Sequence, residues 1–221
     1  MGSPAPVIQL ISRQGFSADY PLANSNQRNE QIPLRPLRQP LYDTEVIANT
    51  GNSTTLNFFQ RPLNNTTAVG SVTKTYAETN LQQSAQIPFP QVFAITGFVF
   101  ETQPGTLIAD WRKIYTTSYV QFFFSGTKYY LTIPTTRIPC GVGPDGFAAI
   151  DGNTTNTDAI EVHNGIAHVE NIYGFTVNQG RMLIQNGEAF GLTLNWATAQ
   201  TLTSTSTRVR MYILGILFVS L

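Results

Sequence analysis

The sequence predicts an all-β protein, built as a sandwich or a barrel, on two observations. From about residue 41 onward, short stretches of alternating polar and apolar residues are separated by turn-forming Gly, Asn and Ser, and an alternation of this kind is the period of a β-strand. Only one segment, residues 106–115, spaces its apolar residues as a helix does. A series of short strands with a single short helix is typical of sandwiches and barrels.

Residues 1–40 differ from the rest of the chain in being rich in proline and without a sustained period. Proline fixes φ and removes an amide donor, so this segment is expected to be extended or irregular. It nevertheless carries more large apolar groups than a disordered tail usually does; these are Val7, Ile8, Leu10, Ile11, Phe16, Tyr20 and Leu22. We therefore predict an extended N-terminal arm over residues 1–40 that packs on another surface, and a β-sandwich domain over residues 41–221.

The elements of this domain follow in order along the chain. We expect strands over residues 44–48, 54–60, 91–101, 118–125, 128–133, 136–138, 160–170, 182–185 and 188–196. Gly126-Thr127 joins two of them in a compact hairpin. Residues 106–115 form the short helix, and residues 140–152 form a Gly-rich loop.

The C-terminal stretch TRVRMYILGILFVSL raises the question of what an almost uninterrupted apolar run does at residues 211–221. A transmembrane helix needs about 20 apolar residues, so the run is too short to be one. Its β-branched and aromatic residues favour a strand, and residues 207–211 approach it in strand alternation. We predict a long strand in the middle of a sheet, buried on both faces, with Gly215 where another group packs closely.

The composition limits the partners that the protein can have. Charged residues make up 12% of the chain and the formal net charge is zero, so polarity comes mainly from Thr, Asn, Gln and Ser. A nucleic-acid-binding protein normally presents a basic patch, and Arg13, Arg35 and Arg38 are too few for the arm to bind a genome tightly. We expect broad contacts with other proteins and no direct sequence-specific binding of nucleic acid.

One local cluster has the residue types of a metal site. Asn164-Gly165 is a signal for a two-residue hairpin turn, which would bring Glu161, His163 and His168 to one face. Two imidazoles and a carboxylate could bind a divalent metal. The alternative is a solvated hairpin face on which Glu161 and His168 pair across the strands. We expect the solvated face, and therefore no metal and no cofactor.

No pattern in the sequence supports catalysis. Cys140 is the only cysteine, so an internal disulfide is excluded. A thiol hydrolase would place this cysteine beside a histidine and an oxyanion hole. We expect instead that Cys140 is a small buried thiol at the start of a Gly/Pro loop. No serine lies in a G-x-S-x-G context. We predict no catalytic residues and no enzymatic activity.

The last two predicted strands carry a resemblance. EAFGLTLNW, at residues 188–196, is an alternating strand that ends in Asn-Trp, and a Thr/Ser loop connects it to RVRMYILGILF at residues 208–218, with a glycine in mid-strand. This pair resembles the end of the major capsid proteins of tailless icosahedral viruses that infect bacteria or archaea. The resemblance is specific in these two strands and a general pattern over the rest of the domain.

The resemblance implies a single jelly-roll sandwich of about eight strands, because the chain is too short for a double jelly roll. It also implies a structural capsid protein that assembles with copies of itself, as a trimer or larger capsomer, and with other capsid proteins. Such a protein resides in the virion, and in the host cytoplasm during assembly, with or without a viral membrane beneath the shell. The alternative is a jelly-roll binding module, such as a phage vertex or spike protein or a carbohydrate-binding protein with Trp111 or Trp196 at its site.

Overall fold

The computed structural model describes residues 7–9, 19–21, 34–49, 53–69, 72–103, 106, 108–124, 129–138, 146–150, 159–163, 173–174, 182–202 and 206–220. The chain divides into two compact units: an N-terminal unit of residues 1–35 with 220–221, and a sandwich unit of residues 36–219. Within the N-terminal unit, β1 (Val7–Gln9) pairs with β2 (Asp19–Pro21) in antiparallel register. These short extended pieces agree with a proline-rich segment that cannot sustain a longer ladder.

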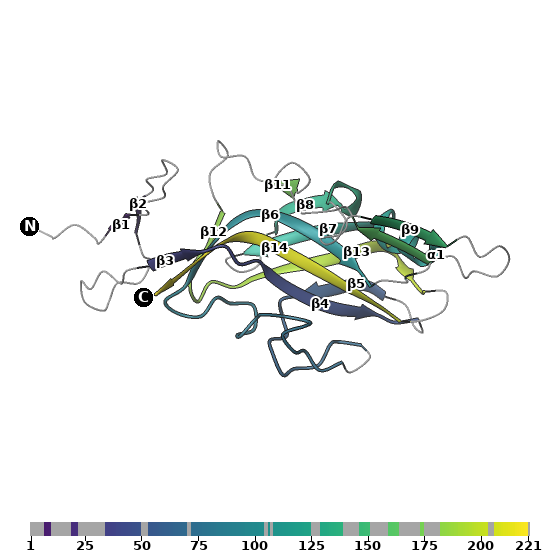
Figure 1. The fold of residues 1–221 in the computed structure, drawn as a ribbon, viewed down its shortest axis with the longest axis horizontal. Helices are drawn as coiled ribbons and strands as arrows, with labels where there is room; N and C mark the ends of the chain where they lie inside the picture. Colours follow the sequence, from purple (N-terminus) through teal and green to yellow (C-terminus); the bar gives the residue numbers. More distant parts are fainter. Residues whose placement is uncertain are drawn as a thin grey trace, which may run out of the picture. The chain divides into compact units, whose positions relative to one another are not determined.

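The first large sheet is built around the C-terminal strand. β14 (Thr207–Ser220) lies between β4 (Leu41–Ile47) and β6 (Val92–Thr102), antiparallel to both. β11 (Tyr173–Gly174) and β12 (Met182–Ile184) pair with the other edge of β6, and β3 (Leu34–Leu37) also joins β14. The predicted central position of the terminal strand is therefore confirmed (Figure 1).

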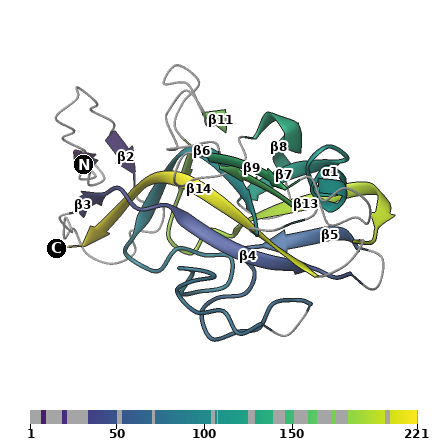
Figure 2. The ribbon, with the colours of Figure 1, turned by 45° about the vertical axis from the view of Figure 1, so that its right-hand side comes forward.

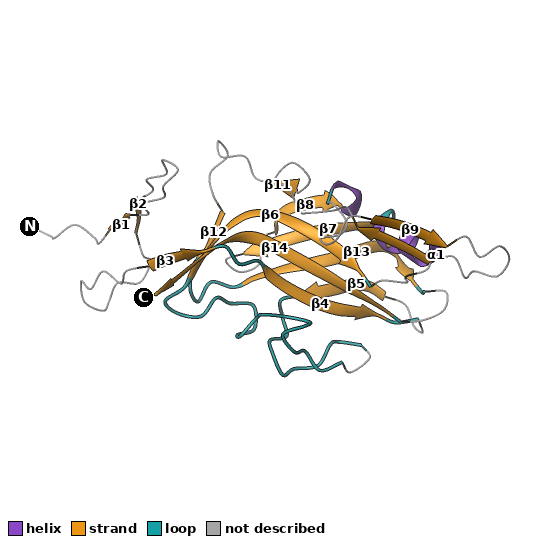
Figure 3. Ribbon diagram, viewed as in Figure 1, coloured by secondary structure: helices purple, strands orange, loops and turns teal. Residues whose placement is uncertain are grey.

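The second sheet has four strands, all antiparallel. Its order is β5 (Ser53–Phe58), β13 (Phe190–Gln200), β7 (Ser118–Phe124) and β8 (Tyr129–Pro134). The two sheets stack face to face, with β13 and β7 behind β14 and β6 (Figure 2). The described part of the chain is thus an all-β sandwich with one short helix (Figure 3).

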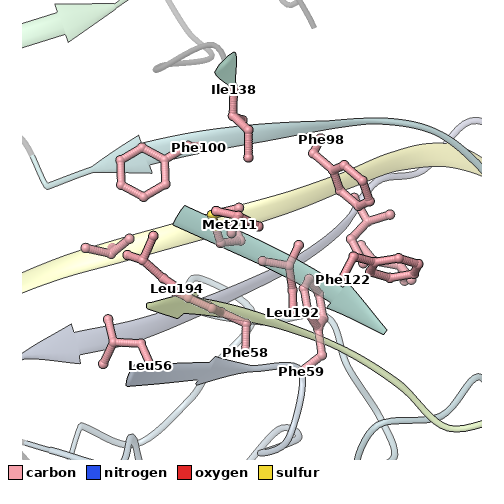
Figure 4. Close-up of a cluster of buried hydrophobic side chains, with 14 of the residues drawn as sticks. Leu56, Phe58, Phe59, Phe98, Phe100, Phe122, Ile138, Leu192, Leu194 and Met211 are labelled. Carbon is pink, nitrogen blue, oxygen red and sulfur yellow. The ribbon is translucent and has the colours of Figure 1, made fainter. Parts of the chain in front are cut away.

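Aromatic and aliphatic side chains from both sheets fill the space between them (Figure 4). Phe98 of β6 and Phe122 of β7 meet across the gap with ring centroids 5.3 Å apart, and neither ring is exposed. Leu192 and Leu194 of β13 and Met211 of β14 are also fully buried. Each such side chain contributes roughly 1.5–3 kcal/mol on burial, so this core is the main source of stability.

A β-bulge explains why odd-numbered residues in the first part of β6 and even-numbered residues in its second part face the same core. The ladder between β14 and β6 skips Thr96, which is exposed. One extra residue in a strand moves the side chains that follow it to the opposite face of the sheet from the one that strict alternation would give. Phe93 and Ile95 before the bulge, and Phe98 and Phe100 after it, are consequently all buried in the core.

The burial of β14 corrects the prediction that both of its faces are covered. Val209, Met211 and Ile213 face the core and are not exposed at all. On the other face Tyr212 and Leu214 are partly exposed within the chain, as is Ile216 after the bulge. Two-face burial therefore holds only for the end of the strand, where Leu217 and Phe218 are 8% and 6% exposed.

The predicted strands over residues 44–48, 54–60, 91–101, 118–125, 128–133, 182–185 and 188–196 are confirmed within a few residues, as is the helix, α1 (Ile108–Tyr115). The strand expected over residues 136–138 is wrong. A 3-10 turn, η1 (Thr135–Arg137), follows Pro134 there, and the Ile138 N–H donates to the Thr135 carbonyl at 2.9 Å.

The loop expected over residues 140–152 is wrong in part, because β9 (Gly146–Ile150) lies within it and pairs with β10 (Ala159–His163). The apolar residues FAAI of β9 do not alternate with polar residues, so the sequence gives no strand signal at this position.

Candidate functional site

The sequence-predicted metal candidates lie partly outside the described residues. Glu161 and His163 are on β10, where their backbones pair with Ala148 and Gly146 of β9. His168 lies outside the described residues, together with the Asn164-Gly165 turn and Cys140. The residues that the structure describes contain no group of three or more potential His, Cys, Asp or Glu ligands. The solvated hairpin face that we expected at Glu161, His163 and His168 therefore stays a prediction.

A different cluster of ionisable groups is prominent in the structure: Asp43, Glu45 and Lys74, here called the Lys74 cluster. All three residues are completely buried. The Lys74 ammonium donates to Asp43 Oδ1 and to Glu45 Oε1, each at 2.7 Å. Buried lysine is uncommon and is normally found paired. This site therefore brings an amine and two carboxyl groups into direct contact away from water.

The strand period of β4 accounts for the two carboxylates of the cluster. Residues 41, 43, 45 and 47 share one face of the strand, so Asp43 and Glu45 stand between Leu41 and Ile47, which belong to the core. The sequence contains this signal, because two acidic residues share a parity with apolar residues at both ends of the strand. The sequence does not show which cation meets these carboxylates, because nothing local indicates that a lysine in the connection between β5 and β6 is buried.

Lys74 comes from the long connection between β5 and β6, residues 59–91. Its backbone is anchored on both sides, because its N–H donates to the Asn65 carbonyl at 2.7 Å and its own carbonyl accepts from the Asn64 N–H at 2.9 Å. A bridge between Thr66 and Thr73 brings the two arms of this segment together. The lysine side chain is thus presented to β4 by a locally closed turn of backbone.

Every carboxylate oxygen of the cluster has a donor. Asp43 Oδ2 accepts the Phe59 N–H at 2.6 Å, and Glu45 Oε2 accepts the Ala68 N–H at 3.0 Å. The half-exposed Arg61 guanidinium lies 3.5 Å from Glu45 Oε1 and supplies a second positive charge. A buried charge group is tolerated only when its polar atoms are satisfied in this way.

Burial is the largest influence on the titration of Asp43. It raises the pKa of this carboxyl from 3.8 to about 6, although the Lys74 ammonium and the Phe59 N–H act in the opposite direction. The cause is desolvation, which disfavours the charged form of any group taken out of water. The neutral carboxylic acid of Asp43 is consequently close in free energy to its carboxylate at neutral pH.

A second polar cluster covers the opposite face of β4 and β14 and is centred on Arg210. Its guanidinium donates to Thr44 Oγ1 at 2.9 Å, to the Ala77 carbonyl at 2.7 Å and to Glu101 Oε2 at 3.3 Å. The Tyr212 hydroxyl donates to the same Glu101 oxygen at 2.6 Å. Burial and this hydrogen bond raise the pKa of Tyr212 to about 12. These contacts tie residues 72–80 of the connection to the outer face of the sheet.

An open hollow of about 200 Å³ lies beside Arg210, with polar walls formed by Thr44, Glu101, Thr102, Gln103, Arg208 and Arg210. The side chain of Arg208 is 47% exposed and lies 3.4 Å from Glu78. Nearby, the tip of the connection carries Tyr76, which is 69% exposed. The side chains around this hollow can donate hydrogen bonds to a polar group and accept hydrogen bonds from it.

The two tryptophans considered for sugar binding occupy different environments. Trp196 is 4% exposed and donates its indole N–H to the Lys113 carbonyl at 3.0 Å, so it belongs to the core. Trp111 is partly exposed and stacks on Tyr115 with ring centroids 4.8 Å apart. Only Trp111 therefore keeps a ring that another molecule could reach.

Comparison of the chain with protein-family models, with curated proteins and with solved structures gives no match. The helix in the described part of the chain lacks the length and apolar character needed to cross a bilayer.

Proposed function

We propose that this chain is a structural capsid protein with a single jelly-roll fold, which assembles into an icosahedral virus shell. The observation that carries the proposal is the order of the sandwich strands. In chain order, the eight strands compared are β4, β5, β6, β7, β8, β11/β12, β13 and β14. Across one sheet the strands are β4, β14, β6 and β11/β12, which are the first, eighth, third and sixth along the chain. The other has the order second, seventh, fourth, fifth. A jelly roll arranges its eight strands in this order, and viral capsid domains are among its principal users.

The composition and the division of the chain support the same proposal. A neutral surface rich in uncharged polar groups suits a protein that meets identical neighbours on several sides, because like charges would repel in a lattice. The chain divides into an N-terminal unit and a sandwich unit, a division that suits a jelly-roll domain preceded by an arm. Fold alone does not determine function, so the proposal stands on these features together.

In this proposal the partners are copies of the same chain, as trimers or larger capsomers, and other capsid proteins. Contacts run through the arm at residues 1–40 and through the edges of the sandwich. The protein acts without enzymatic turnover, without sequence-specific contact to the genome, and resides in the virion after assembly in the host cytoplasm. A viral membrane beneath the shell is compatible with this arrangement.

The alternative is a jelly-roll binding module, and the buried Trp196 counts against its carbohydrate-binding form. Trp111 is the remaining candidate for a sugar platform. A glycan-array experiment with wild-type protein and Trp111→Ala separates the two functions, because the capsid proposal expects no binding that depends on this ring.

Sedimentation velocity and negative-stain electron microscopy of the purified full chain test the proposal directly. We expect trimers, larger capsomers or closed particles. Deleting residues 1–40 is expected to leave a folded domain, by circular dichroism, that assembles poorly. A full chain that stays monomeric at high concentration would contradict the capsid function, and normal assembly of the truncated chain would contradict the role of the arm.

A further inference from the structure

We propose that Lys74 and Asp43 form an intramolecular amide bond, with Glu45 as the acid–base group that transfers the protons. This bond would be a covalent modification that the protein makes on itself, once per chain. It concerns the interior of one protomer and is independent of the proposed function. Three features of the Lys74 cluster lead to it: contact between the reacting groups, exclusion of water, and a second carboxylate on the same nitrogen.

Contact between the reacting groups is already established in the fold. Lys74 Nζ lies 2.7 Å from Asp43 Oδ1, and the carboxyl carbon lies one bond beyond this oxygen. Intramolecular reactions gain most when the reacting atoms are held about 3–3.5 Å apart. The anchored backbone on both sides of Lys74 and the pairing of β4 with β14 at Asp43 keep the ammonium and the carboxyl group in this hydrogen-bonded contact.

Burial makes the reactive protonation states accessible. An ammonium and a carboxylate do not react with each other, whereas a neutral amine and a carboxylic acid can. Neither side chain has any exposed surface, and loss of water around Asp43 disfavours its carboxylate relative to the carboxylic acid, which raises its pKa. A proton can therefore move from Nζ to Oδ1 along the hydrogen bond that joins them.

The surroundings distinguish the roles of the two carboxyl groups. Glu45 Oε1 lies 2.7 Å from the same Lys74 nitrogen and 3.5 Å from the Arg61 guanidinium, so it is placed to take a proton from that nitrogen and has a second counter-ion. Asp43 has no arginine partner among the described contacts, and its Oδ2 accepts the Phe59 N–H at 2.6 Å. This N–H can stabilise the negative charge that develops on Oδ2 during attack, as the donors of an oxyanion hole do. Asp43 is therefore the acyl group and Glu45 the base.

The reaction balances without any added reagent. After the first proton transfer, the Nζ lone pair attacks Cγ of Asp43, a C–N bond forms, and the electrons of the C=O bond move to Oδ2. Glu45 removes one proton from the nitrogen. The Oδ2 electrons then restore the carbonyl while the bond from Cγ to Oδ1 breaks, and Glu45 returns its proton to the departing hydroxyl group. The products are one secondary amide, one water molecule and the original Glu45 carboxylate.

The bond would tie β4 to the connection of residues 59–91 and close the chain between positions 43 and 74. The whole segment from Phe59 to Lys74, which also carries the N–H donors to both carboxylates, would then be unable to separate from the sheet edge. A cross-link of this kind limits the unfolded chain in the way that a disulfide does.

Intact-mass spectrometry of the denatured full chain tests the proposal. We expect the folded wild-type protein to be lighter than its sequence by the mass of one water molecule, and proteolysis to yield a branched peptide that joins Asp43 to Lys74. A wild-type mass equal to that of the unmodified sequence would overturn the proposal, as would a branch point at Glu45 in place of Asp43. This readout needs no variant to fold.

Two variants test the assigned roles. Lys74→Arg keeps the positive charge but has no amine to acylate, and Glu45→Gln keeps the shape of the side chain but cannot act as a base. Both are expected to show the full mass of their sequences when circular dichroism shows them folded. Loss of one water from folded Lys74→Arg would overturn the assignment of the nucleophile, and complete loss from folded Glu45→Gln would overturn the assignment of the base.

Discussion

Replacing Gly215 by alanine adds one methyl group to the interior strand β14, and we expect it to lower the free energy of unfolding by about 1–2 kcal/mol. An ideal Cβ at this position would overlap the carbonyl oxygen of Ala94 and would lie 2.6 Å from Cζ of the Phe93 ring. The Ala94 oxygen belongs to the backbone of β6, which pairs with β14 at this point. Neither strand can move away from the added methyl group without breaking backbone hydrogen bonds between β6 and β14.

The magnitude follows from two opposing effects. Overpacking of a well-filled interior costs typically 1–3 kcal/mol. Removing a glycine also restricts the unfolded chain, which returns about 0.4–1 kcal/mol. The net loss corresponds to a fall in melting temperature of roughly 2–8 °C for a chain of this size.

Gly191→Ala in β13 is the matched control. Its Cβ would overlap Cζ of Phe123 and would lie 2.8 Å from Nε2 of Gln60. Both obstacles are ends of side chains that are partly exposed, so they can rotate away. The unfolded chain gains the same restriction, and the cost is expected to be smaller than at Gly215 by about 1 kcal/mol.

Urea titrations followed by the fluorescence of the buried Trp196 give both free energies by linear extrapolation. An equal or larger loss for Gly191→Ala would refute the reasoning, because the cost would then not depend on contact with backbone.

Three further outcomes concern single side chains. Ile213→Lys should abolish folded protein, since an unpaired buried ammonium costs several kcal/mol, whereas Leu214→Lys on the partly exposed face should fold. Far-ultraviolet circular dichroism distinguishes folded from unfolded variants. An unfolded Leu214→Lys would contradict the exposure of that face. The pKa of Tyr212, raised from 10.0 to about 12, means that the fold favours the neutral phenol, so stability is lost as the pH rises between these values. Tyr212→Phe should remove this part of the pH dependence of the urea midpoint, and an unchanged profile would contradict it. Phe89 is 73% exposed, so Phe89→Ser should change the free energy of unfolding by no more than about 0.5 kcal/mol; a larger loss would show that the ring is packed within the chain.

Much of the sandwich could be predicted from periodicity, because a strand that is buried on one face repeats every second residue. The bulge at Thr96 could not. The segment VFAITGFVF contains two apolar phases, and the sequence alone does not reveal that one skipped residue directs both phases into the same core. The position of the bulge is determined by pairing with β14, which lies more than a hundred residues later in the chain.

The terminal strand shows a different limit of sequence-based prediction. Its apolar residues occupy both parities, which correctly indicates an interior strand with apolar surroundings. The sequence does not say which chain provides those surroundings. Within one protomer Leu214 and Ile216 remain partly exposed, so the prediction of two-face burial is wrong for this middle part of the strand and holds only at its end, where Leu217 and Phe218 are buried. In the proposed shell, a neighbouring copy of the chain would cover this face.

The site could be predicted least. The Glu161, His163 and His168 candidates are close together in the sequence. The Lys74 cluster, by contrast, joins positions 43 and 74 through a loop whose path depends on tertiary structure. The two carboxylates of β4 were detectable as charged residues in the core phase of a strand. Their partner was not, because a lysine in a polar connection carries no local signal of burial.

The charges around the Lys74 cluster provide a physical reason why amide formation is favourable there. As ions, Asp43, Glu45, Lys74 and Arg61 sum to zero, but three of the four are removed from water, at a cost of several kcal/mol for each ion before their mutual attraction is counted. Amide formation consumes one positive and one negative charge of this set. The Glu45 carboxylate then remains with Arg61 as its counter-ion, 3.5 Å away and at the half-exposed edge of the cluster. The cross-linked state therefore keeps the charge balance and places two fewer ions in the interior. The desolvation free energy that destabilises the salt bridge is then no longer needed for Lys74 and Asp43, and its removal favours conversion into the covalent bond.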